Sequence, residues 1–108
     1  MNDKSNILLQ VRQSAEKKIL YLPHALRQML KPGRFITFNE IRKIINIGEI
    51  IEDYPDDPRG HSCLIFGVGE GERPIHIVCS PKKEYLAIIT AYLPDPKQWN
   101  KNFKVRIK

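Results

Sequence analysis

The stretch RPIHIVCSPKKEYLAIITAY, residues 73–92, holds two apolar runs separated by a short polar turn. The runs are rich in isoleucine, valine and threonine, which favour extended backbone, and the Pro-Lys-Lys sequence between them is typical of a turn. The pattern predicts a β-hairpin with strands over 75–80 and 85–93. Pro94 and Pro96 follow the second run and end it, because proline cannot donate a hydrogen bond to a neighbouring strand.

Three polar side chains in this hairpin raise the question of a site. Successive side chains of a strand point to opposite faces, so the register of the hairpin decides which of them meet. With a turn centred on Lys82, paired residue numbers sum to about 164 to 166, and an even sum places His76 opposite Ile88 or Thr90. His76 then shares one face with Thr90 and Tyr92. The alternative is that the three residues only decorate a half-solvated face.

Upstream of the hairpin, apolar residues recur at helical spacing. The segment from residue 6 to about 19 carries one apolar helical face, made of Leu8, Val11, Ala15 and Ile19. After a break at residues 21–22, a second short helix is predicted over 23–30, since proline fits the first turn of a helix and not its interior. Thr37 and Glu40 have the spacing of a capping box, which predicts the start of a third helix.

Between the third helix and the hairpin, the period of the apolar residues changes to that of strands. Residues 49–54 predict an edge strand and residues 61–68 a longer one. Two to three N-terminal helices followed by four strands predict an α+β fold, with the helices packed on a four-stranded, mainly antiparallel sheet. The length fits a single domain over residues 1–108. The basic tail, residues 97–108, is either a short strand or a helical turn anchored by Trp99.

The chain has a net charge of +6 and a sequence pI of about 9.5, and the charges are segregated. Residues 49–57 hold five acids and no base, whereas residues 97–108 hold five bases and no acid. This segregation favours a polyanionic partner, and we expect RNA; the alternative is an ordinary solvated charged surface. No apolar run suits a membrane helix and no secretory signal is visible, so we expect a cytoplasmic protein, without a membrane partner, whose two cysteines are free thiols.

Two histidines and two cysteines raise the possibility of a zinc site; they are His61, Cys63, His76 and Cys79. Strand alternation argues against it, because His76 faces away from the two cysteines, which we expect to be small buried side chains facing each other. The sequence has no phosphate-binding loop, dinucleotide fingerprint or nucleophile elbow. We therefore predict neither a metal nor a cofactor.

Five pieces of the sequence resemble, in order, the motifs of a large family of short bacterial domains of unknown function. The pieces are PHALRQM at 23–29, IGEIIEDY at 47–54, CLIFG at 63–67, RPIHIV at 73–78 and IITAYLPDPKQW at 88–99. The family is grouped with the barnase–EndoU–colicin–RelE class of ribonuclease folds, in which N-terminal helices pack on a four-stranded antiparallel sheet. The resemblance covers about residues 8–106.

This resemblance implies a function and a set of residues. It suggests the toxin of a type II toxin–antitoxin system, similar to RelE or MqsR, which cleaves messenger RNA and has a partner antitoxin with a zinc finger and a helix-turn-helix. The site residues that the resemblance implies are the polar members of the motifs: His24, Arg27, His76, Thr90 and Tyr92.

RNA cleavage without a metal needs a base for the 2′-OH, an acid for the 5′-oxygen and a cation for the phosphorane. We expect His24 and His76 to share the acid–base work, with either as the base, because histidine titrates near neutral pH. Arg27 would hold the phosphate through its bidentate fork, and Thr90 and Tyr92 would position it. The alternative is a non-catalytic module that binds RNA or a protein, with no cleavage and a steep salt dependence for RNA.

Overall fold

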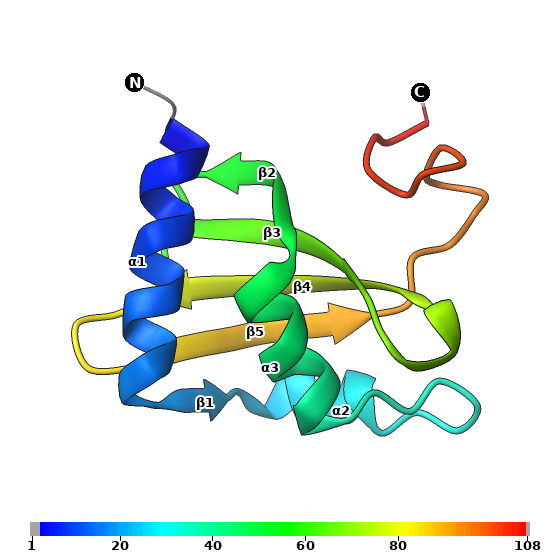
Figure 1. The fold of residues 1–108 in the computed structure, drawn as a ribbon, viewed down its shortest axis with the longest axis horizontal. Helices are drawn as coiled ribbons and strands as arrows, with labels where there is room; N and C mark the ends of the chain where they lie inside the picture. The colour runs from blue at the N-terminus through cyan, green and yellow to red at the C-terminus, as the bar shows by residue number, and fades with distance from the viewer. Residues whose placement is uncertain (1–2, 108) are drawn as a thin grey trace.

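A five-stranded sheet forms the centre of the protein, and helices α1 and α3 cross one of its faces (Figure 1). The computed structural model describes residues 3–107. In chain order the elements are α1 (Asp3–Lys17), β1 (Ile19–Tyr21), α2 (Pro23–Met29), α3 (Phe38–Ile47), β2 (Glu49–Tyr54), β3 (Ser62–Val68), the 3-10 helix η1 (Glu70–Glu72), β4 (Pro74–Pro81) and β5 (Leu86–Tyr92). The predicted α+β class, with N-terminal helices packed on a sheet, is confirmed.

The sheet has one more strand than the sequence predicts. Its order is β1-β5-β4-β3-β2, with antiparallel pairs from β2 to β5 and β1 parallel to β5 at one edge. The sequence indicates a helix reaching residue 19 and then a break, but Ile19 pairs with Leu86 and Tyr21 with Ile88. Three residues are too few to show an alternating pattern, so this strand is defined by its pairing with β5 rather than by its own sequence.

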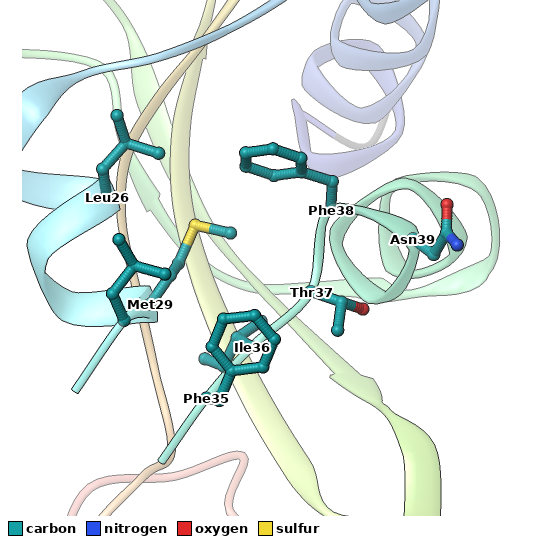
Figure 2. Close-up of a pocket in the computed structure, with 8 residues that line it drawn as sticks. Leu26, Met29, Phe35, Ile36, Thr37, Phe38 and Asn39 are labelled. Atoms are coloured by element: carbon teal, nitrogen blue, oxygen red, sulfur yellow. The ribbon is translucent and has the colours of Figure 1, made fainter. Parts of the chain in front are cut away.

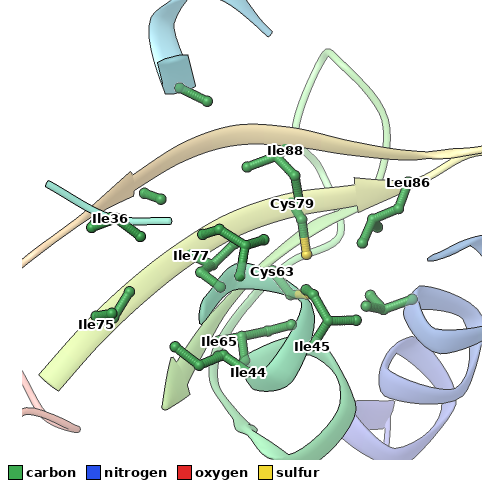
Figure 3. Close-up of a cluster of buried hydrophobic side chains, with 14 of the residues drawn as sticks. Ile36, Ile44, Ile45, Cys63, Ile65, Ile75, Ile77, Cys79, Leu86 and Ile88 are labelled. Atoms are coloured by element: carbon green, nitrogen blue, oxygen red, sulfur yellow. The ribbon is translucent and has the colours of Figure 1, made fainter. Parts of the chain in front are cut away.

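The core lies between the sheet and the helices. The side chains of Ile75, Ile77 and Cys79 on β4 face the helices, and all three are fully buried (Figure 3). A close approach of α3 to β3 occurs at Gly67, where an added Cβ atom would lie 2.5 Å from the Ile44 side chain. Only glycine fits at that position, because any side chain there would push the helix off the sheet.

Helix α1 confirms the predicted apolar face in part, since Leu8, Val11 and Ala15 all pack on the core, but burial on this helix also includes an adjacent row. Its buried residues are Ile7, Val11 and Ser14. Leu8 is half-buried and Ile19 belongs to β1. The apolar pattern misses Ser14 because the residue is polar, yet its hydroxyl donates to the Lys82 carbonyl oxygen at 2.7 Å and so tolerates burial. No helix within residues 3–107 is long and apolar enough to cross a membrane.

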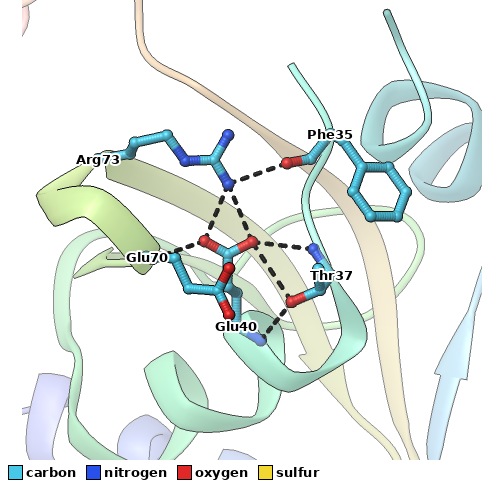
Figure 4. Close-up of polar contacts among 5 residues, drawn as sticks. All are labelled: Phe35, Thr37, Glu40, Glu70 and Arg73. Atoms are coloured by element: carbon cyan, nitrogen blue, oxygen red, sulfur yellow. Dashed lines mark hydrogen bonds and ion pairs between the residues drawn. The ribbon is translucent and has the colours of Figure 1, made fainter. Parts of the chain in front are cut away.

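Helix α3 begins with the predicted capping box. The Thr37 hydroxyl accepts from the Glu40 amide, and the Glu40 carboxylate accepts from the Thr37 amide, both at 3.0 Å. The same carboxylate also binds Arg73 at 2.9 Å and the Glu70 amide at 2.8 Å (Figure 4). Burial works to raise the pKa of Glu40, but these hydrogen bonds outweigh it and hold the pKa below its usual range. One carboxylate therefore ties the start of α3 to the connection between β3 and β4.

Helix α2 runs beside the outer edge of β5. The Leu22 amide donates to the Ile88 carbonyl oxygen at 3.1 Å, which fixes the start of the helix next to that strand. Ala25 and Met29 are buried in the core, and the observed span agrees with the predicted one to within a residue. Helix α2 thereby lies along the part of the β5 edge beyond the short strand β1.

Candidate functional site

The hairpin of β4 and β5 presents its polar residues on the face opposite the helices. His76 pairs with Tyr92 and Val78 pairs with Thr90, so the predicted sharing of one face is confirmed. The partner of His76 is Tyr92, however, and neither Ile88 nor Thr90. Two differences from the predicted register cause this. The turn lies further along the chain than Lys82, so that paired numbers beside it sum to 167, as for Cys79 and Ile88. A β-bulge between Val78 and Cys79 then shifts the register by one more residue, to a sum of 168.

His76 is fully buried at the centre of this face, with no exposed surface. Its Nε2 atom lies 2.7 Å from the Phe103 carbonyl oxygen and its Nδ1 atom lies 3.3 Å from the Tyr92 hydroxyl. Because a carbonyl oxygen only accepts, Nε2 carries the proton, and a neutral ring then accepts at Nδ1 from the tyrosine. Burial lowers the pKa of His76, against the opposing effects of the Phe103 hydrogen bond and the Glu52 charge, in agreement with a neutral ring.

The C-terminal segment, residues 94–107, covers this polar face. Trp99 is only 2% exposed and meets the His76 ring edge-on, with ring centroids 4.4 Å apart. An antiparallel bridge between Trp99 and Arg106 closes the segment into a loop. The tail is therefore neither the strand nor the helical turn that the sequence suggests, although Trp99 is its anchor.

The charges of this segment are partly neutralised within the chain. Arg106 binds the Glu52 carboxylate at 2.9 Å and lies over the Trp99 ring, 4.6 Å from its centroid. Lys104 binds Glu49 at 2.6 Å. These exposed pairs contribute at most about 1 kcal/mol each. The basic tail and the acidic strand, which the sequence shows as opposed charge clusters, thus meet in the folded chain.

Glu52 and Tyr54 extend the polar cluster toward the edge of the sheet. The Tyr54 hydroxyl donates to the Glu52 carboxylate. Burial, together with this hydrogen bond, raises the pKa of Tyr54 to about 12. Burial also works to raise the pKa of Glu52, but hydrogen bonds from Arg106 and Tyr54 hold it below its usual range. Altered pKa values cluster in active sites and also in structural networks, so the cluster is a candidate on chemical grounds.

His24 and Arg27 lie outside the buried cluster. Both side chains are exposed on α2, and neither side chain makes a hydrogen bond or an ion pair with any residue that the structure describes. Leu26 lines a groove between α2 and α3. Because residues two apart on a helix are about 200° apart around its axis, His24 lies on the opposite side of α2 from that groove. The structure thus joins His76 to Tyr92 and leaves His24 near the outer edge of β5, with His76 one strand further in.

The four residues considered for zinc do not converge. Cys63 and Cys79 pair across β3 and β4 as free, fully buried thiols on the core side of the sheet, as predicted. The hydrogen bond to Cys63, with burial, raises the pKa of Cys79, which keeps the thiol protonated. His76 faces the other way, and no three histidine, cysteine or acidic side chains in residues 3–107 come close enough to hold a metal ion.

The fold and the site define a small α+β domain with helices on one face of a mixed sheet and a sealed polar cluster on the other. Residues 21–93 match the family described as a domain of unknown function (DUF4258), and because the match spans more than half of the chain, the chain belongs to that family. The matched part contains His24, Arg27, His76, Thr90 and Tyr92 and leaves out α1 and the C-terminal segment. No match was found among the curated proteins or the solved structures.

The buried histidine predicts a pH dependence of stability. The folded pKa of His76 is lowered from 6.5, so just below that pH the unfolded chain binds more protons than the folded one. The stability is therefore fully present above pH 6.5 and is lost as the pH falls toward the folded pKa. The pKa values of the Glu40 and Glu52 carboxyl groups are held below 4.5, so these groups affect the stability only at lower pH.

Urea unfolding at about pH 7.5 and about pH 5.5 checks this prediction. The wild type should be less stable at the lower pH, and His76→Gln should lose most of that difference. Equal pH dependence in the two proteins would assign the effect to other groups.

Proposed function

We propose that the protein is the toxin of a type II toxin–antitoxin system and a metal-independent endoribonuclease that cleaves messenger RNA by attack of the 2′-OH. The observation that carries the proposal is the position of α2. Its exposed His24–Arg27 face begins beside β5, the strand on which Thr90 and Tyr92 are half-buried. The net charge of +6 supports an RNA substrate. The likeness to RelE and MqsR, and a zinc-finger antitoxin as the partner, form part of the same proposal.

Exposure and chemistry suggest the roles. Of the two histidines in the set, His24 is exposed and His76 is buried, so His24 is the acid–base group: it takes the 2′-OH proton and returns a proton to the leaving 5′-oxygen. Arg27, three residues later on the same side of the helix, binds the non-bridging phosphate oxygens. Thr90 and Tyr92 offer hydroxyl groups to the nucleotide.

His76 acts as a positioning residue in this scheme. Both of its ring nitrogens are engaged and its surface is covered, so it does not touch RNA in this conformation. Its hydrogen bond holds the Tyr92 hydroxyl in place. Replacing His76 therefore affects activity through Tyr92 and through the stability of the sheet.

Expression in a bacterial host is the first test of the proposal. The wild type should arrest growth, and His24→Ala or Arg27→Ala should restore it, because losing the acid–base or charge-stabilising group lowers cleavage about 10²- to 10⁴-fold. His61→Ala is the matched control, since His61 is bound to Asp53 and lies outside the proposed site. Normal growth with the wild type, or equal arrest with His24→Ala, would contradict the proposal.

A second candidate, a non-catalytic module that binds RNA or a protein, is favoured by the sealing of His76 and the internal pairing of Lys104 and Arg106. In its RNA-binding form it predicts binding that weakens steeply with salt, and in either form intact RNA and no growth arrest. The growth test separates the two candidates.

A further inference from the structure

An apolar groove opens between α2 and α3 (Figure 2). By helical spacing it lies on the side of α2 away from His24. Its volume is about 380 Å³, which is within the range of sites that take small ligands or anchoring side chains. Most of its lining is aliphatic or aromatic and comes from both helices and the loop between them: Leu26, Met29, Leu30, Phe35, Ile36 and Phe38. Thr37 and Asn39 complete the lining.

The side chains that form the walls of this groove are exposed, whereas its floor is buried. Leu30 is 61% exposed, and Phe35 and Phe38 are each 53% exposed. Met29 is buried beneath them, and the Phe38 ring packs on Tyr21 with centroids 4.5 Å apart. Large apolar side chains gathered around a concavity mark an interaction site, in contrast to single exposed apolar residues.

Positive charge borders one side of the groove. From Arg27 to Lys43 the chain holds five bases and one acid, and that acid, Glu40, is buried against Arg73. Lys31 follows Leu30 of the α2 wall in sequence, and Arg34 precedes Phe35. The rim cations, defined as Lys31 and Arg34, are exposed, and neither is in an ion pair with another residue of the described chain.

We propose that this groove binds an acidic, amphipathic helical segment of another protein. Its apolar side chains, spaced three and four residues apart, enter the groove between α2 and α3, as is typical of helix-in-groove recognition. Its carboxylates face the rim cations, which gives the charge complementarity that directs the choice of partner. This binding surface goes beyond the proposed RNA cleavage and does not depend on it.

Two other occupants fit the same surface less well. RNA bases stack on flat aromatic rings, but four of the six apolar lining residues are aliphatic: Leu26, Met29, Leu30 and Ile36. A second copy of the chain in a symmetric contact would bring the rim cations of both copies together, which like-charge repulsion disfavours. An acidic protein segment satisfies both the apolar lining and the charge.

The test uses the full chain and a labelled synthetic peptide of about 18 residues, long enough to form a helix. The peptide has leucine at helical spacing and glutamate at most other positions; a second peptide has the same composition in scrambled order. Fluorescence anisotropy should show the first peptide binding at least about 10-fold more tightly than the scrambled one. Leu30→Ala and Phe35→Ala should each weaken binding about 10-fold, as expected for a buried anchor, and Lys31→Glu with Arg34→Glu by a similar factor.

Matched controls are Ile47→Ala and Lys101→Glu, an exposed apolar residue and an exposed cation outside the groove, which should leave binding unchanged. Equal binding of both peptides, or no binding, would overturn the proposal. A single-stranded RNA oligomer whose binding weakens equally in Leu30→Ala and Phe35→Ala would assign the groove to RNA instead. Sedimentation that shows a dimer abolished by Phe35→Ala would assign it to a second copy.

Discussion

Replacing Glu40 by alanine is expected to lower the free energy of unfolding by about 3 kcal/mol, because a buried carboxylate that accepts several hydrogen bonds is lost. The Glu40 side chain is 2% exposed and accepts hydrogen bonds from Arg73, from the Thr37 amide and from the Glu70 amide. Its loss leaves the half-buried Thr37 amide at the start of α3 without its acceptor and removes the counter-charge of Arg73. Urea unfolding at neutral pH measures the change.

Two variants separate the roles of this carboxylate. Thr37→Ala removes only the capping hydroxyl and should cost about 1 kcal/mol. Glu16→Ala removes an exposed carboxylate from α1 and should change the stability by at most about 0.5 kcal/mol. If Glu40→Ala cost no more than Thr37→Ala, the contacts with Arg73 and Glu70 would contribute nothing, contrary to our interpretation.

Replacing Trp99 by alanine is expected to destabilise the protein by about 3 to 5 kcal/mol, the range for a buried aromatic residue. Trp99 is 2% exposed, packs on the His76 ring and supports the guanidinium of Arg106. Without the indole, His76 becomes accessible to water, which removes the cause of its lowered pKa. Urea unfolding gives the stability, and titration of the histidine signals by NMR should show the pKa of His76 rising toward its ordinary value.

Val105→Ala is the control for this prediction, because Val105 lies in the same segment and is 59% exposed. It should change the stability by at most about 0.5 kcal/mol. A loss of less than about 1 kcal/mol in Trp99→Ala, with the His76 titration unchanged, would mean that the C-terminal segment does not seal this face.

The elements that the sequence predicts correctly are those with local signals. The capping box at Thr37, the proline at the start of α2 and the alternating strands of the β4–β5 hairpin each depend on residues close together in the chain. His76 and Tyr92 share one face as predicted, but only because the β-bulge changes the odd register beside the turn into an even one at His76. The strand β1 and the β-bulge lack such signals, because pairing with distant residues defines them.

The surroundings of His76 are the main feature that the sequence does not reveal. The C-terminal segment returns over the sheet, and no local sequence pattern indicates either its path or its ion pair with β2. Glu52, Tyr54 and Arg106 are therefore absent from the predicted set. One signal for Glu52 existed: it pairs with Leu64, which lies opposite Val78, and strand alternation continues that row to Thr90. A register carried across the whole sheet would have placed Glu52 on the polar face.

The most direct test of the central claim, RNA cleavage at the His24–Arg27 face, is digestion of a defined RNA by the purified chain in EDTA, with analysis of the product ends. The proposal predicts cleavage by the wild type that leaves 2′,3′-cyclic phosphate ends, as attack by the 2′-OH requires. It also predicts rates about 10²- to 10⁴-fold lower for His24→Ala and an unchanged rate for His61→Ala. RNA that stays intact with the wild type, or is cut equally fast by His24→Ala, would contradict the account.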